Sequence, residues 1–200
     1  MPSSPRWKPS ARPAAALSPT AEDPTDPDVA RIVEVLDRHG VDYLVVGGAA
    51  ARIYGAKRRT KDTDCLVRRS ADNLERLAAA MRELNARLHV DGLSDEEASA
   101  LPVTLDAFTL ARLEISTWRT DAGDLDILAD IPDREGVHRR YEDLRPAARP
   151  ATVDGMAIWV AALPDVIASK EWAGRPKDRE ALPELYELAG RETSEEEPLN

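Results

Sequence analysis

The sequence YLVVGGAAARIYG, residues 43–55, and the sequence RRTKDTDCLV, residues 58–67, together determine the fold that we predict for this chain. The first begins with an apolar run typical of a buried strand, passes through two glycines and continues into an alanine-rich segment that favours a short helix. The second reads as a neighbouring strand with Asp62 and Asp64 at its start. With the later elements, the pattern predicts an α/β domain in which helices cover a small mixed sheet and form the carboxy-terminal part.

The glycine pair Gly47-Gly48 has the properties of a phosphate-binding turn. Because glycine lacks a side chain, its backbone amide approaches phosphate oxygens closely, and the positive end of the following helix faces the same place. Basic residues near the turn and late in the chain are candidate phosphate ligands, although spacing alone does not bring the late ones to the turn. These cations are Arg58, Lys61, Lys170, Arg175 and Lys177.

Asp62 and Asp64 are predicted to share a metal site. Alternate residues of a strand point to one face, so both carboxylates face the same way. A second acidic strand, GDLDIL at residues 123–128, supplies Asp126, which lies between apolar residues and therefore needs a metal ion or another partner. Such a cluster suits two Mg²⁺ ions roughly 3.5 to 4 Å apart, which activate an attacking oxygen and stabilise a leaving group. Asp124 shares this face but is interpreted as a turn residue.

The composition fits one folded domain and restricts its partners. Two hundred residues with 42% hydrophobic content bury one sizeable core. A net charge of -10 argues against broad, nonspecific nucleic-acid binding, although local basic groups remain. One group surrounds the Asp62/Asp64 pair. The other comprises Arg139, Arg140, Arg145 and Arg149, of which the first two are interpreted as a solvated face.

The domain boundaries and the compartment follow from simple sequence features. No apolar segment reaches the roughly 18 residues of a transmembrane helix, so no membrane span is expected. The single cysteine, Cys65, excludes an intramolecular disulfide and fits a reducing cytoplasm. Residues 1–25 lack the apolar run of a signal peptide and are interpreted as a disordered leader. Residues 26–190 are predicted to form the domain, with a helical element over 163–190, and residues 191–200 an acidic flexible tail.

Taken together, the glycine pair, the run from Arg58 to Asp64 and the later Asp126 resemble the nucleotidyltransferase superfamily, whose members share the polymerase-β-like fold. The resemblance extends over roughly residues 28–190. It implies that Asp62, Asp64 and Asp126 bind magnesium and that the glycine turn holds phosphate. It also implies that a nucleoside triphosphate is the substrate.

A later run, Ser169-Lys170 followed by residues 174–178, is similar to the carboxy-terminal element of the bacterial AbiEii and MenT-type toxins. By this resemblance Lys170 joins the three aspartates as a catalytic residue. The superfamily often has Gly-Ser in its turn, whereas the Gly-Gly pair of this chain agrees with the toxin branch. The nucleotide-binding residues implied by the resemblance are Gly47, Gly48, Arg58, Thr60, Lys61, Arg175, Lys177 and Asp178.

These resemblances imply a metal-dependent enzyme that moves a nucleoside monophosphate from a nucleoside triphosphate to an acceptor hydroxyl. In the toxin branch, the expected acceptor is the 3′ end of tRNA or another RNA, and a cognate antitoxin is an expected partner. Two alternatives stay open. One is transfer to an aminoglycoside or lincosamide antibiotic, since an acidic protein suits a cationic aminoglycoside. The other is a non-catalytic nucleotide-binding module that acts as an antitoxin.

Overall fold

The computed structural model describes residues 27–196, with side chains up to residue 191. The predicted leader, residues 1–25, and the last four residues of the predicted tail lie outside the described residues. The described strands are β1 (Tyr43–Val45), β2 (Asp62–Val67), β3 (Arg87–His89), β4 (Ile115–Thr120), β5 (Gly123–Leu128), β6 (Asp130–Pro132), β7 (His138–Arg140), β8 (Arg149–Val153) and β9 (Met156–Val160). The described helices are α1 (Val29–Arg38), α2 (Gly47–Ile53), α3 (Ala71–Glu83), α4 (Asp95–Ser99), α5 (Ala107–Leu110), α6 (Tyr141–Leu144), α7 (Leu163–Ala173) and α8 (Pro176–Glu196).

The main sheet is mixed, as the sequence predicts. Its strand order is β3-β4-β5-β2-β1-β9-β8, and a separate hairpin pairs β6 with β7. The pairs β2/β5 and β1/β9 are parallel, whereas the remaining neighbours in the main sheet are antiparallel. The parallel pairing of β2 with β5 is central to the site, because it joins the two acidic strands that lie far apart in the sequence.

One face of the central strands forms the main core. Buried and partly buried residues alternate at the start of β2 and along β5, where Thr63, Cys65, Leu125 and Ile127 are buried and the aspartates between them are only partly buried. These side chains belong to one apolar cluster with residues of α1 and α3, such as Leu36 and Leu77. The alternation therefore directs the acidic side chains away from the core.

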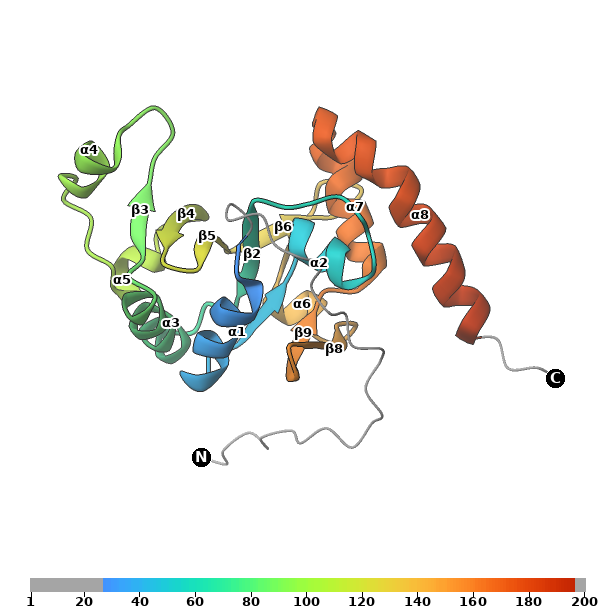
Figure 1. Cartoon of the computed structure of the whole chain (residues 1–200), viewed down its shortest axis with the longest axis horizontal. Helices are drawn as coiled ribbons and strands as arrows, with labels where there is room; N and C mark the ends of the chain where they lie inside the picture. The colour runs from blue at the N-terminus through green and yellow to red at the C-terminus, as the bar shows by residue number, and fades with distance from the viewer. Residues whose placement is uncertain (1–26, 197–200) are drawn as a thin grey trace.

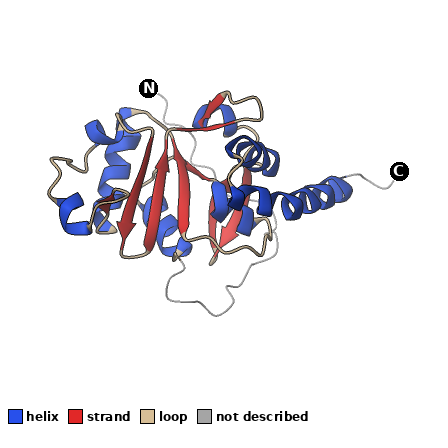
Figure 2. Cartoon of the chain, turned by 90° about the horizontal axis from the view of Figure 1, so that it is seen from above, coloured by secondary structure: helices blue, strands red, loops and turns tan. Residues whose placement is uncertain are grey.

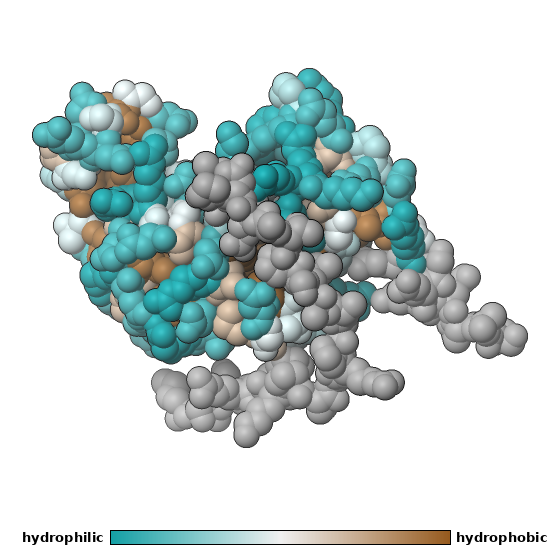
Figure 3. All heavy atoms as spheres, viewed as in Figure 1, coloured by the Kyte–Doolittle hydropathy of each residue, from teal (hydrophilic) through white to brown (hydrophobic). Residues whose placement is uncertain are grey.

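The opposite face of these strands lies between two projections. One is formed by β3 and α4 and the other by α7 and α8, which stand on either side of β4, β5 and β2 (Figure 1). The view from above shows the strands in the middle with helices grouped at both sides (Figure 2). In the space-filling view the surface is hollowed between the two projections (Figure 3).

The two carboxy-terminal helices pack on α2 through a second, smaller core. Buried side chains from α2, α7 and α8 form this cluster, with Leu163, Ile167 and Leu185 among its largest members. The hydroxyl of Tyr54, at the end of α2, donates to the backbone oxygen of Ala161 at 2.9 Å. The helix that follows the glycine turn is thereby fixed to the late helices.

Local signals in the sequence predict several helix ends correctly. Ser94 and Glu97 form a capping box at the start of α4, which a serine followed three residues later by a glutamate predicts. Gly174 ends α7 in a left-handed conformation with φ of +55°, as a glycine at this place predicts. Helix α8 begins at Pro176, so Asp178, which the sequence suggests as the cap of this helix, lies inside its first turn. Helix α8 continues through Pro183 to Glu196, beyond residue 190, the predicted end of the domain. Within residues 27–196 no helix combines the length and apolar character needed to cross a bilayer.

Candidate active site

The register of β2 and β5 brings the predicted carboxylates together. Asp62 lies opposite Asp124, and Asp64 lies opposite Asp126. Because paired residues and alternate residues of neighbouring strands share a face, all four side chains lie on the face turned away from the main core. The expectation that Asp126 stands on a strand adjacent to the Asp62/Asp64 pair is therefore confirmed.

The glycine turn closes directly onto Asp64. The amide of Gly48 donates to Asp64 Oδ2 at 3.1 Å. Gly47 has a left-handed φ of +59°, and a Cβ atom built on it would lie 2.0 Å from the same carboxylate oxygen. Position 47 therefore requires glycine both for its backbone conformation and for its contact with Asp64. The amide predicted to hold phosphate is at the same time a hydrogen-bond donor to the carboxylate.

Thr60 fills the space beside Gly48. A Cβ atom built on Gly48 would lie 2.5 Å from Thr60 Oγ1 and 2.9 Å from Thr60 Cβ. The Thr60 hydroxyl donates to Asp62 Oδ1 at 2.7 Å and also lies 3.1 Å from the Asp62 backbone oxygen. Thr60 thus orients the Asp62 carboxylate and leaves no room for a serine at position 48.

Gly48→Ser should consequently destabilise this protein, although serine is frequent at this place in the superfamily that the sequence resembles. We expect the overpacking against Thr60 to lower the free energy of unfolding by roughly 1 to 3 kcal/mol, measured by urea denaturation. The double variant Gly48→Ser/Thr60→Ala should recover only part of that loss, because it removes the 2.5 Å contact with Thr60 Oγ1 but keeps the 2.9 Å contact with Thr60 Cβ and loses the hydrogen bond to Asp62. Strictly additive effects of the two substitutions would show that the contact is absent.

Electrostatics make Asp64 the most perturbed carboxylate of the site. Burial raises the pKa of Asp64 to about 7, and the charges of Asp62 and Asp126 act in the same direction. The hydrogen bond from Gly48 and the charge of Lys170 oppose this rise. Burial also raises the pKa of Asp126, while its hydrogen bond with Thr117 lowers it. Crowded carboxylates of this kind ionise together only when a cation compensates their charge.

The chemistry of the donors fits a divalent cation, although the carboxylates do not converge on one point. Asp126 Oδ1 is buried and lacks a hydrogen-bond partner among the described residues, which is costly unless the oxygen binds an ion. Across the described part of the chain, however, no group of three or more His, Cys, Asp or Glu side chains is close enough to hold a metal ion. Binding by Asp62, Asp64 and Asp126 would have to draw these carboxylates closer together.

The raised pKa of Asp64 predicts how the stability of the metal-free protein depends on pH. The folded protein keeps the proton on Asp64 up to about pH 7, whereas the ordinary pKa of the unfolded chain is 3.8. Between these two pH values the folded state therefore binds more protons than the unfolded state. The contribution of Asp64 to the free energy of unfolding consequently falls as pH rises. The fall amounts to up to roughly 4 kcal/mol at 1.36 kcal/mol per pKa unit.

Urea unfolding with a chelator, from about pH 4 to pH 8, measures this dependence. Asp64→Asn should be increasingly more stable than the unsubstituted protein as pH rises through the interval. A stability difference between the two proteins that stays constant with pH would show that Asp64 does not titrate in this way.

The junction of α7 and α8 contains the predicted phosphate ligands from the carboxy-terminal part of the sequence, Lys170, Arg175 and Lys177. Asp178 is fully buried and is held by Arg175 (Nε to Oδ2, 2.6 Å) and Lys170 (Nζ to Oδ1, 3.4 Å). Burial alone would raise the pKa of Asp178, but the hydrogen bond and charge of Arg175, with the charge of Lys170, hold it below its ordinary value. Asp178 therefore positions two cations, and the nucleotide-binding role that the resemblance implies for it stays a prediction.

These cations act on the strand carboxylates across the fold. The charge of Lys170 opposes the rise in the pKa of Asp64, and the charge of Lys177 opposes the rise in the pKa of Asp126. The pKa of Arg175 is raised, first by its hydrogen bond with Asp178 and further by the charges of the strand aspartates. The structure thus brings Lys170, Arg175 and Lys177 to the acidic face.

Arg58 and Lys61 are placed differently from the late cations. Arg58 Nη1 pairs with Glu180 Oε2 of α8 at 2.7 Å, and both side chains remain largely exposed. The ion pair therefore ties the segment after α2 to α8. Lys61 is exposed beside Asp62. The phosphate-binding roles of both residues stay predictions.

Sequence reasoning missed Thr117. It lies opposite Asp126 in the antiparallel pairing of β4 with β5, and it forms a hydrogen bond with that carboxylate. The alternating pattern around Ile115 and Thr117 indicates a strand, but nothing in it specifies which carboxylate the threonine faces. Thr117 therefore helps to orient the third carboxylate.

Comparison of the fold with solved structures gives clear counterparts. The antibiotic-resistance factor ANT(2″)-Ia, in complex with adenylyl-2″-tobramycin, is similar over 84% of this chain and 90% of its own, with 15% identity and a TM-score of 0.52. The lincosamide antibiotic adenylyltransferase LnuA, bound to lincomycin, is similar over 80% of this chain and 96% of its own, with 11% identity and a TM-score of 0.50. The chain has a nucleotidyltransferase fold.

At these identities the similarity concerns the fold, which agrees with the fold class predicted from the glycine turn and the acidic strands. No protein-family model matches the sequence, and no curated protein matches it. The toxin branch suggested by the late Lys170 to Asp178 run stays a prediction.

Proposed function

We propose that this protein is a metal-dependent nucleotidyltransferase that moves a nucleoside monophosphate from a nucleoside triphosphate to an acceptor hydroxyl. The observation that supports this proposal best is the placement of Asp62, Asp64 and Asp126 on one sheet face against the Gly47-Gly48 turn. The nucleotidyltransferase fold adds support, since the two similar structures described above are of nucleotidyl-transferring proteins.

Each residue of the site has a role in such a transfer. The acceptor oxygen would attack the α-phosphorus in line with the departing pyrophosphate, so that one P–O bond forms and another breaks. Asp62, Asp64 and Asp126 would hold Mg²⁺, which when bound neutralises phosphate charge and orients the reacting oxygens. The buried oxygen of Asp126 is also suited to accept the proton of the acceptor hydroxyl. Lys170 would neutralise charge on the phosphates.

The acceptor that the sequence resemblance favours is RNA. We propose that the protein is the toxin of a toxin–antitoxin pair and modifies the 3′ end of tRNA, in keeping with the similarity of residues 169–178 to the AbiEii and MenT-type toxins. A cognate antitoxin would then neutralise it in the cell.

A labelling assay tests the reaction and the acceptor together. The purified protein is incubated with each of the four α-labelled nucleoside triphosphates, Mg²⁺ and total tRNA, and the RNA is separated on a denaturing gel. The proposal requires label on the RNA with at least one triphosphate, and chelation of Mg²⁺ should remove it. Failure to label RNA with any of the four would overturn the RNA assignment.

An antibiotic is the second candidate acceptor. Both solved structures described above concern antibiotic-modifying proteins, and the net charge of -10 suits a cationic aminoglycoside. Parallel reactions with aminoglycosides and lincosamides, followed by mass spectrometry, would detect a nucleotidylated drug. A protein whose melting temperature rises with nucleoside triphosphate but which labels neither RNA nor drug would instead be a nucleotide-binding module without turnover.

A further inference from the structure

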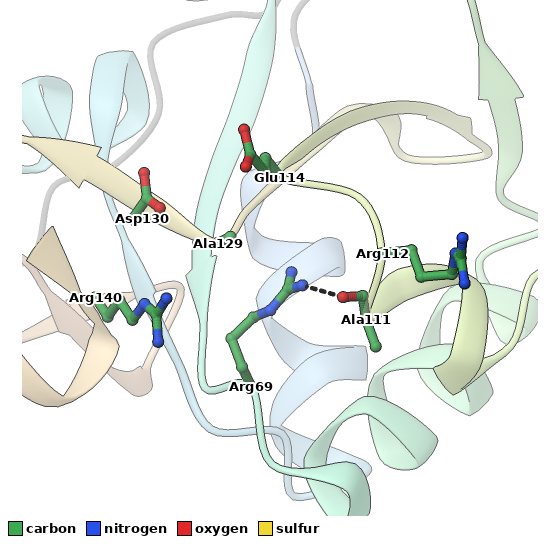
Figure 4. A pocket seen from close by; sticks show the side chains of 7 residues that line it. All are labelled: Arg69, Ala111, Arg112, Glu114, Ala129, Asp130 and Arg140. Atoms are coloured by element: carbon green, nitrogen blue, oxygen red, sulfur yellow. Dashed lines mark hydrogen bonds between the residues drawn. The ribbon is translucent and has the colours of Figure 1, made fainter. Parts of the chain in front are cut away.

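A basic cavity lies at the other end of the two acidic strands. It has a volume of about 250 Å³ and its charged lining comes from Arg69, Arg112, Glu114, Asp130 and Arg140 (Figure 4). Arg69 follows β2, whereas Asp64 stands near the start of that strand, so the cavity is roughly 16 Å away along an extended backbone. The cavity is therefore separate from the carboxylate cluster.

Arg69 is a fixed part of this cavity. Its Nη1 donates to the backbone oxygen of Leu113 at 2.9 Å, and its Nη2 donates to that of Ala111 at 2.6 Å. These bonds hold the guanidinium at the cavity without neutralising its charge. Burial lowers the pKa of Arg69, and the nearby charge of Arg140 lowers it further, while the charges of Asp130 and Glu114 oppose this fall. Arg69 and Arg140 are therefore close enough to repel each other at the cavity.

The other two arginines are available to a ligand. Within residues 27–191 neither Arg112 nor Arg140 pairs with a carboxylate. Arg112 instead lies over the ring of Phe108, with 5.2 Å between the guanidinium carbon and the ring centroid. The Phe108 side chain is 70% exposed, which is unusual for an aromatic residue of this size. An exposed ring beside free guanidinium groups has the character of a nucleic-acid contact.

The acidic residues of the lining do not neutralise the cavity. Asp130 Oδ1 lies 2.7 Å from Nδ1 of His138, whose ring is charged only when it is protonated. Asp130 and Glu114 together place two negative charges against three guanidinium groups. The lining therefore keeps a net positive charge, which favours an anionic ligand with several acceptor oxygens. Phosphate is such a ligand, and a guanidinium group binds it well because its N–H donors lie in one plane and bind two oxygens at once.

We infer that this cavity binds a phosphodiester group of a single-stranded nucleic acid, with a neighbouring base stacked on Phe108. The ligand would be part of the acceptor strand whose end is modified at the distant carboxylates, and in this respect the inference rests on the proposed function. The local cavity supplies the positive charge that the acidic protein as a whole lacks.

Binding of a short 5′-fluorescein-labelled single-stranded RNA to the full-length protein tests the inference by anisotropy, without triphosphate or metal. Arg112→Gln/Arg140→Gln should weaken binding about tenfold or more at low salt. It should also make the slope of log affinity against log salt shallower by roughly 0.7, the value for one phosphate contact on a single strand. Phe108→Ser should weaken binding about tenfold with little change in that slope. Arg69 is left intact because it holds two backbone carbonyls.

Two further variants separate specific binding from a general charge effect. Glu114→Gln should strengthen RNA binding several-fold, because it removes the opposing charge from the cavity. Arg191→Gln removes one positive charge from the exposed carboxy-terminal half of α8 and should leave affinity and salt slope unchanged. Equal losses from Arg191→Gln and from a single Arg112→Gln substitution would overturn the inference.

Competition identifies the source of the phosphate. Unlabelled RNA should displace the probe at far lower concentration than inorganic phosphate or a nucleoside monophosphate. Displacement by free phosphate at equal concentration would overturn the assignment to an acceptor strand. The binding assay contains no triphosphate, so RNA binding at the cavity can be shown even if the protein does not transfer nucleotides. Conversely, RNA binding that does not change in the arginine variants would overturn the cavity inference without contradicting nucleotidyl transfer.

Discussion

Asp64→Asn should abolish nucleotidyl transfer and at the same time stabilise the metal-free protein. The substitution removes a metal-binding charge worth several kcal/mol to the transition state, so the rate should fall by at least about 10³-fold, at one factor of ten per 1.36 kcal/mol. It also removes a carboxylate whose pKa is raised to about 7 by burial and by its acidic neighbours. Initial-rate assays with labelled triphosphate and thermal melts with a chelator measure the two effects.

The melting temperature of metal-free Asp64→Asn should exceed that of the unsubstituted protein by several degrees at pH 8, with about 2 to 4 °C for each kcal/mol gained. The gain should be smaller at pH 5, where Asp64 is already protonated in the folded protein. Asp124→Asn is the matched control on the same face, opposite Asp62, and should retain transfer within about tenfold. An active Asp64→Asn enzyme, or loss of activity confined to Asp124→Asn, would show that the site is assigned to the wrong carboxylate.

Gly47→Ala should cost both stability and transfer. The left-handed φ of +59° strains any residue with a side chain, by roughly 1 to 2 kcal/mol. The added Cβ would also lie 2.0 Å from Asp64 Oδ2 and 2.5 Å from Asp64 Cγ, so either the turn or the strand carboxylate must move. We expect the free energy of unfolding to fall by at least about 2 kcal/mol and transfer to fall about a hundredfold or more, because position matters to within about an ångström at a reacting centre.

Gly155→Ala separates the backbone strain from the steric conflict. Gly155 has a φ of +82°, also in the left-handed region, but a Cβ there would meet nothing within 4 Å. The control variant should lose roughly 1 kcal/mol of stability and keep its transfer rate. If the two alanine variants were equally active and equally destabilised, the contact between the glycine turn and Asp64 would be unimportant.

Much of the fold was predictable because its signals are local. The apolar run before Gly47 predicts a strand, and the glycine at position 174 predicts the end of a helix. The alternation of acidic and apolar residues in 123–128 predicts a strand with its carboxylates on one face. Such periodicities arise from backbone geometry within a few residues, so they can be detected without knowledge of the partner elements.

Parts of the site were not predictable because they depend on pairing between distant segments. The sequence indicates two acidic strands, but only the parallel register of β2 with β5 places Asp126 beside Asp64. A slip of one residue would have turned that carboxylate into the core. The hydrogen bond from Thr117 likewise depends on the pairing of β4, which no local pattern specifies.

The sequence by itself determined that a glycine turn precedes a strand beginning with two carboxylates, and that a second acidic strand lies far downstream. Tertiary structure decided that Thr60 fills the space beside Gly48, that Asp178 is buried between Lys170 and Arg175, and that Arg58 turns to Glu180. The physical reason is that local backbone preferences select strands and turns, whereas the packing of elements distant in sequence decides which side chains meet.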